Sequence, residues 1–139
     1  MTLNEIISSI LTYGNNHAQI KYTWFGGFAE KLDDNDVIYP AMFVDLEGSS
    51  FLPKLLTHTV SIYIMDRHIA ETEALEVLSD TSLICEDIIA QLRNNSNIYT
   101  VADNITMQPF MEAEPDYLAG WRLDVALTVP SINNRCQIP

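Results

Sequence analysis

The sequence predicts an α+β fold, a largely antiparallel sheet packed by one long helix and a short N-terminal helix. Three observations lead to this prediction. Residues 3–13 and 70–93 carry apolar side chains at helical spacing. Residues 55–65 alternate as a half-buried antiparallel strand does. The helical and strand-like segments come in runs and do not alternate strictly, which is typical of α+β proteins.

The first predicted element is a helix over residues 3–13. Its apolar residues fall on one face at three- and four-residue spacing: Leu3, Ile6, Ile7, Ile10 and Leu11. Gly14, followed by two asparagines, predicts the end of this helix. Thr2 and Asn4 are both suitable N-terminal caps, and the sequence leaves that choice open.

Strand-like segments follow at residues 18–28, where Gly26 and Gly27 interrupt the pattern, and at residues 37–46. Between them lies an acidic loop, and Pro40 suggests an edge position or the beginning of a strand. Alternation places Met42, Val44 and Leu46 on one face of the second segment and Ala41, Phe43 and Asp45 on the other.

Residues 47–54 read as a loop or hairpin tip because they contain Gly, two Ser and Pro. This loop carries Phe51 and Leu52. The next segment, residues 55–65, is the clearest strand, with His58 and Ile62 on its apolar face.

The dominant helix is predicted over residues 70–93, and no Gly or Pro interrupts it. Its apolar stripe consists of Leu75, Leu78, Ser82, Cys85, Ile88, Ile89 and Leu92, widened by Val77, Thr81 and Ile84. Three strands are expected after it, at residues 98–101, 105–111 and 118–129, with an acidic turn at 112–116. Residues 131–139 form a tail, read either as an extended C-terminal arm or as a frayed terminus.

Composition describes one acidic domain covering residues 1–139. The chain has 47% hydrophobic residues and a net charge of −12, which argues against wrapping nucleic acid or binding an anionic membrane. It contains no apolar run of transmembrane length, and its N-terminus lacks the basic start of a signal peptide. Two cysteines are too few for a disulfide scaffold or a zinc site. We therefore expect a soluble, cytosolic single domain.

No motif in the sequence predicts catalysis, a cofactor or a metal. His17, His58 and His68 lack metal-ligand spacing; His58 is expected to pack, and His68 to be solvated. The carboxylates of residues 112–116 favour a charged turn over an acid–base pair. An enzyme using Glu112, Glu114 and Asp116 remains an alternative from a different functional class.

Two features fit an assembly protein. The long helix carries an acidic set, read either as a solvated face or as a surface that repels DNA: Glu73, Glu76, Asp80, Glu86 and Asp87. The second feature is apolar residues in predicted loops, among them Phe51 and Leu52, for which core and interface positions are equally open.

A series of short motifs runs in order along the chain: VIYPAMFV at residues 37–44, VSIYIMD at 60–66, EVLSDT at 76–81, PF at 109–110, LAGW at 118–121 and NRCQIP at 134–139. This series resembles small virion proteins of tailed bacteriophages, of the tail-terminator and head–tail joining (neck) type. The likeness is to those from phages of Bacteroides-type hosts, including crAss-like phages, and spans residues 3–139.

The resemblance implies an α+β ring protein, a hexamer or a dodecamer, around the channel through which DNA leaves the capsid. It implies location in the virion after synthesis in the host cytoplasm, no catalytic residues and no cofactor. Its expected partners are its own copies and neighbouring neck, portal-adaptor or tail-tube proteins, and DNA passes without specific binding. The candidate interface residues are Phe51, Leu52, Glu112, Glu114, Asp116, Cys136 and Ile138. The alternative is an acidic adaptor or inhibitor-type protein-binding module.

Overall fold

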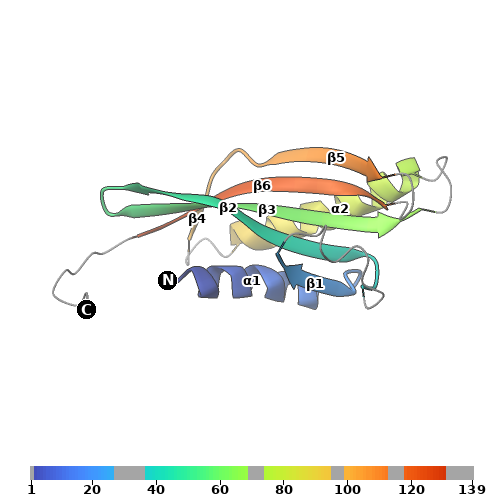
Figure 1. Ribbon diagram of the computed structural model, residues 1–139, viewed down its shortest axis with the longest axis horizontal. Coiled ribbons are helices and arrows are strands. Elements are labelled where there is room, and N and C mark those ends of the chain that lie inside the picture. The colour runs from blue at the N-terminus through green and yellow to red at the C-terminus, as the bar shows by residue number, and fades with distance from the viewer. Residues whose placement is uncertain (1, 27–36, 69–73, 95–98, 113–117, 131–139) are drawn as a thin grey trace.

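The computed structural model describes residues 2–26, 37–68, 74–94, 99–112 and 118–130. Within these ranges the chain forms two helices and six strands. In chain order they are α1 (Leu3–Asn16), β1 (Tyr22–Phe25), β2 (Ala41–Leu52), β3 (Leu55–Arg67), α2 (Ala74–Asn94), β4 (Thr100–Val101), β5 (Thr106–Glu112) and β6 (Leu118–Pro130). Figure 1 shows the long strands β2, β3 and β6 running side by side in the sheet.

The strands form one sheet in the order β1-β2-β3-β6, and both β4 and β5 pair with the free edge of β6. β1 pairs with β2 in parallel, whereas the other pairings are antiparallel. The long helix α2 packs on this sheet, as the sequence predicts. The α+β prediction is therefore confirmed.

The main core lies between the two helices and one face of the sheet. Its apolar side chains come from alternate positions of the three long strands and from one side of each helix: Ile6, Ile10, Met42, Val44, Val60, Ile62, Ile64, Ile84, Cys85, Ile88, Leu92, Leu123, Val125 and Leu127, among others. The alternation predicted for residues 55–65 is confirmed, and it places His58 on this buried face.

A second, smaller core lies on the opposite face of the sheet. It contains Val37, Ala41, Phe43, Met65 and Leu118, all buried. The faces predicted for residues 41–46 are thus correct, but both faces of this end of the sheet are apolar. Burial on two faces explains why β2 begins with four consecutive apolar residues, Ala41 to Val44.

Helix α1 is longer than predicted. Thr2 caps its start, because the Thr2 hydroxyl accepts a hydrogen bond of 3.2 Å from the Glu5 amide. Gly14 does not end the helix but lies inside it and is buried against β1 and β2. A side chain at position 14 would overlap the end of Met42, so the glycine permits close packing rather than a helix stop.

Three further predictions are wrong. The loop alternative for residues 47–54 is wrong and the hairpin alternative is right, because β2 continues to Leu52 past a bulge at Glu47 and only Pro53 and Lys54 make the turn. Leu75 is not part of the buried stripe of α2 but is 76% exposed. His68 is buried instead of solvated. The predicted start of α2 at residues 70–73 lies outside the described residues.

Candidate assembly surfaces

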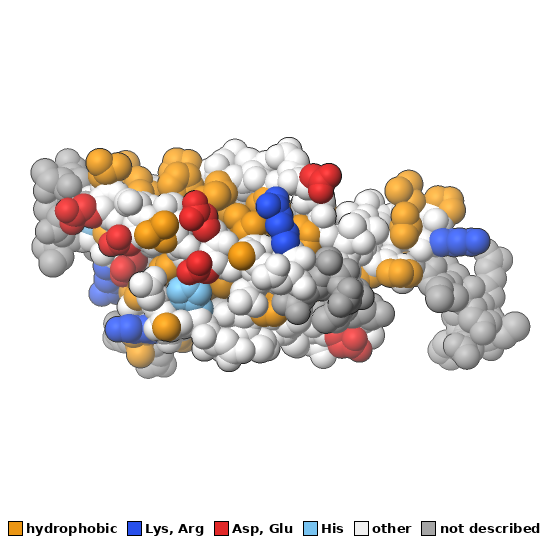
Figure 2. All heavy atoms as spheres, turned by 180° about the vertical axis from the view of Figure 1, so that it is seen from behind, with side chains coloured by type: hydrophobic (Ala, Val, Ile, Leu, Met, Phe, Trp, Pro, Cys, Tyr) orange, Lys and Arg blue, Asp and Glu red, His pale blue; other side chains and the backbone are white. Residues whose placement is uncertain are grey.

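The β2–β3 hairpin extends well beyond the ends of both helices (Figure 1). Its end carries exposed apolar side chains. We call residues Phe51, Leu52, Lys54 and Leu55 the hairpin tip. Phe51 is 72% exposed, Leu52 63% and Leu55 40%. Figure 2 shows these hydrophobic side chains gathered at the hairpin end beside a basic one. Such an exposed apolar cluster at the end of a rigid arm is typical of a protein–protein contact.

The outer face of α2 is acidic, with an apolar centre. Glu76, Asp80, Glu86 and Asp87 are all exposed, and acidic groups are scattered over this side of the molecule in Figure 2. Leu83 lies among them and is 57% exposed. Asp80, Glu86 and Asp87 are three or four residues from Leu83 and therefore surround it on the helix surface.

The remaining predicted site residues are only partly placed. Glu112 ends β5, so the strand continues one residue into the predicted acidic turn. Glu73, Glu114, Asp116, Cys136 and Ile138 lie outside the described residues. The structure brings Phe51 and Leu52 together at the hairpin tip and keeps them away from the strand end that holds Glu112.

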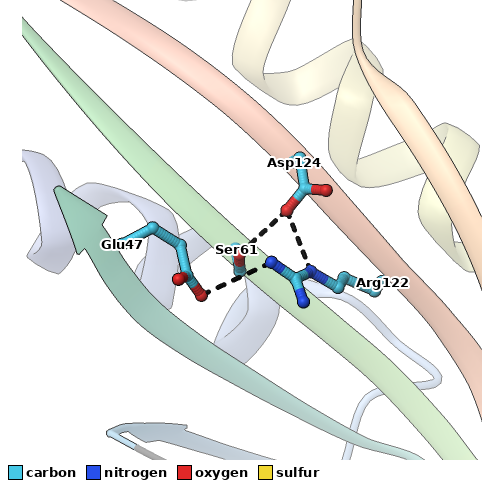
Figure 3. Close-up of polar contacts among 4 residues, drawn as sticks. All are labelled: Glu47, Ser61, Arg122 and Asp124. Atoms are coloured by element: carbon cyan, nitrogen blue, oxygen red, sulfur yellow. Dashed lines mark hydrogen bonds and ion pairs between the residues drawn. The ribbon is translucent and has the colours of Figure 1, made fainter.

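A polar cluster occupies the middle of the sheet face that points away from the helices (Figure 3). The Arg122 guanidinium donates a 3.0 Å hydrogen bond to Asp124 and lies 3.6 Å from the Glu47 carboxylate. The Ser61 hydroxyl donates a 2.9 Å hydrogen bond to the same Asp124 carboxylate. The bond to Asp124 raises the pKa of Arg122. The cluster ties β2, β3 and β6 together, and Arg122 partly neutralises its carboxylates.

A cleft of ≈ 450 Å³ opens at the end of the molecule opposite the hairpin tip. We call it the end cleft. It is lined by residues from the α1–β1 connection, the start of β2, the end of β3 and α2: Ala18, Gln19, Lys21, Pro40, Asp66, Asp80, Thr81, Leu83 and Ile84.

Asp66 and Asp80 give the described lining of the end cleft a net negative charge, because Lys21 is the one basic residue there. Burial raises the pKa of Asp66; the Asp80 charge raises it further, whereas a hydrogen bond from the Arg67 amide and the Lys21 charge act the other way. The end cleft thus combines two carboxylates with the apolar side chains of Pro40, Leu83 and Ile84.

Sequence reasoning missed the end cleft and the cation of the hairpin tip. Lys21, Asp66 and Asp80 are separated by 45 and 14 positions, and no motif links them. Lys54 did carry a signal, because it is the only charged residue from position 48 to position 57.

A second cleft of ≈ 420 Å³ lies where α1 meets α2. On its wall, His17 Nε2 and Asp87 Oδ2 are 2.9 Å apart and hydrogen-bond across the two helices. Tyr13 and Gln91 also line this cleft. The His17–Asp87 contact shows that one acid of the predicted acidic surface also holds the two helices together.

His58 lies on the buried face of β3 and pairs across the hairpin with Ser49, whose hydroxyl is 2.6 Å from His58 Nδ1. Burial lowers the pKa of the His58 imidazole, which therefore favours the neutral form. The Ser49–His58 pair therefore joins the two strands of the β2–β3 hairpin.

We expect His58 to make stability depend on pH. Because its pKa is lower in the folded than in the unfolded chain, the unfolded state binds more protons once the pH falls below about 6.5, and folding becomes less favourable. Urea unfolding at pH 7.5 and pH 5.5 measures this effect. Between these pH values, the free energy of unfolding should fall less for His58→Gln than for the wild type. Equal losses in both proteins would contradict this account.

Cys85 is a fully buried residue of α2 in the main core. Burial raises the pKa of its thiol to about 12, so only about one thiol in ten thousand is a thiolate at pH 8. In a Cys136→Ser variant, we expect no labelling by a thiol reagent in the native protein and complete labelling in guanidinium chloride. Rapid native labelling would contradict the packing of α2.

The described residues contain no group of three or more His, Cys, Asp or Glu side chains arranged to hold a metal ion. Within the same ranges, neither helix has the length and apolar character needed to cross a bilayer. The described residues form three surfaces suited to protein–protein contacts: the apolar hairpin tip, the acidic outer face of α2 and the end cleft with its two carboxylates. Comparison with protein-family models gives no match. Comparison with curated proteins gives none either.

Proposed function

We propose that this protein is a structural virion component of a tailed bacteriophage that assembles as a ring at the neck or tail. There it completes or caps the tail and joins it to the head around the DNA channel. The proposal starts from the resemblance of residues 3–139 to tail-terminator and head–tail joining proteins. The observation that carries it furthest is the hairpin tip, an apolar contact surface that the described fold leaves uncovered.

A ring of identical copies needs a head-to-tail interface, in which two different patches on each copy meet. A rigid arm with an apolar end suits one half of such an interface. Its support comes from pairing of β2 with β3 from Ala41 to Leu52, interrupted only by the bulge at Glu47, and from pairing of β3 with β6 on the other side. The arm therefore projects its contact residues at a fixed position relative to the helices.

The charge of the chain supports a place beside passing DNA. A net charge of −12 and the exposed carboxylates of α2 repel the phosphate backbone. A channel lined with such groups lets DNA move without binding it, which is what a neck or tail ring requires.

The test is deletion of the gene from the phage that encodes it. We expect DNA-filled heads and separate tails in the lysate, seen by electron microscopy, because the proposed ring joins the two. Supplying the wild-type gene from a plasmid should restore complete particles. Supplying a Phe51→Ser/Leu52→Ser variant should not restore them, although that variant should fold. Complete, infectious particles from the deletion phage would contradict the proposal and favour the adaptor alternative.

A further inference from the structure

The hairpin tip and the end cleft lie at opposite ends of the same two strands. β2 begins at Ala41, directly after Pro40 of the end cleft, and runs for 12 residues to the tip. β3 returns from the tip and reaches the cleft at Asp66. At about 3.3 Å per residue the two sites are roughly 40 Å apart, so the tip of one molecule does not reach its own cleft.

The two sites are complementary in charge. Among the described residues, the hairpin tip carries one charged group, the Lys54 ammonium, beside the exposed Phe51, Leu52 and Leu55. The end cleft carries the Asp66 and Asp80 carboxylates against the Lys21 ammonium, which leaves one negative charge uncompensated within its lining. A second ammonium placed between the carboxylates would balance the cleft.

The two sites also match in their apolar parts. Phe51 and Leu52 project from the tip and are largely exposed. The cleft presents Leu83, exposed on α2, beside the half-buried Pro40, whereas Ile84 of its lining is buried. Contact between these sets removes apolar surface from water on both partners at once.

We propose that the hairpin tip of one copy of this protein docks into the end cleft of the next copy. In this contact the Lys54 ammonium lies between the carboxylates of Asp66 and Asp80. The apolar side chains of the tip pack on Leu83. The occupant is a second copy because every copy carries both complementary surfaces, one at each end.

Docking of this kind is head-to-tail, so repeated contacts either close into a ring or extend into a filament. The inference rests on the proposed function only for closure of the ring. The docking contact itself depends only on the residues of the hairpin tip and the end cleft.

The first experiment is chemical cross-linking of the wild-type protein, which links ammonium and carboxylate groups that are in contact. A carbodiimide couples such pairs into amides, and mass spectrometry of the digest identifies the residues. We expect Lys54 linked to Asp66 or Asp80. Because these residues are roughly 40 Å apart within one copy, such a link forms only between copies. Multimers without any Lys54 link would overturn the docking contact.

The second experiment reverses charges. We expect Lys54→Glu to lower the association constant about tenfold or more, because it places a third carboxylate in the cleft. Asp80→Lys should act similarly, and the double variant Lys54→Glu/Asp80→Lys should regain much of the wild-type association. Asp103→Lys is the control, since Asp103 is exposed, does not line the end cleft and is not among the acidic residues that surround Leu83. Circular dichroism checks that each variant folds.

The outcomes separate the docking contact from the proposed function. Rings that are insensitive to Lys54→Glu overturn the contact and leave the ring function standing. Open filaments that require Lys54 uphold the contact and contradict the ring. A wild-type protein that stays monomeric up to its solubility limit and gives no Lys54 link overturns the contact, and the deletion phage then decides the function independently.

Discussion

Gly120→Ala is expected to destabilise the protein by about 4 kcal/mol, near the upper end for a single substitution. Gly120 lies in β6, opposite Met65 of β3 and Phe110 of β5. A Cβ atom here would overlap the Ile64 carbonyl oxygen and lie 2.7 Å from Met65 Cα. These are backbone atoms of a paired central strand, so no side-chain rotation relieves the clash and the strands must separate.

The control for this prediction is Gly48→Ala in β2. A Cβ atom at Gly48 meets nothing within 4 Å, so the change should alter stability by less than about 0.5 kcal/mol. Urea unfolding followed by circular dichroism measures both variants. A Gly120→Ala protein as stable as Gly48→Ala would show that β3 and β6 do not approach as closely as described.

Phe43→Ala is expected to cost about 4 kcal/mol of unfolding free energy. Phe43 is fully buried in the second core, with its ring centroid 6.1 Å from that of Tyr22. Removing the ring leaves a cavity in the second core, and the neighbouring strands of the sheet, which hold Met65 and Leu118, let the cavity collapse only partly. Equilibrium unfolding in urea gives this loss directly.

Phe51→Ala makes the same chemical change eight residues further along β2. Because Phe51 is exposed at the hairpin tip, the substitution should leave the stability of the monomer within about 0.5 kcal/mol of the wild type. It should instead weaken association, measured by light scattering over a dilution series. Loss of monomer stability in Phe51→Ala, or unchanged association, would contradict the assignment of the tip as a contact surface.

The fold class was predictable because periodicity is local. In β3, His58 and Ile62 fall on the buried face as their alternation indicates. The same rule placed Phe43 correctly on the other face, but it could not show that this face has its own core. That core depends on residues from three strands and the segment before β2, whose proximity only the folded chain establishes.

The errors at Gly14 and at residues 47–52 have a common cause. Gly, Ser and Asn favour turns by their local chemistry, and tertiary contacts overrode that preference in both places. Gly14 remains within α1, and because glycine has no side chain, Met42 can pack directly against the helix at this position. Ser49 and Ser50 stay in β2 because β3 offers His58 and Thr57 as pairing partners.

The candidate surfaces were predictable in part. Phe51 and Leu52 stood out in the sequence as apolar residues in a polar stretch, and they are exposed. The end cleft was beyond sequence reasoning because Asp66 and Asp80 come together only through the packing of α2 against the end of β3.

The proposed assembly is a closed ring of identical copies, which can be tested on the purified protein alone. The mass of the purified protein is determined by light scattering over a range of concentrations, and the same sample is imaged in negative stain. We expect a species of six or twelve times 15.7 kDa, seen end-on as a ring with a central hole. A mass of one chain at every concentration, with no rings in the images, would contradict it.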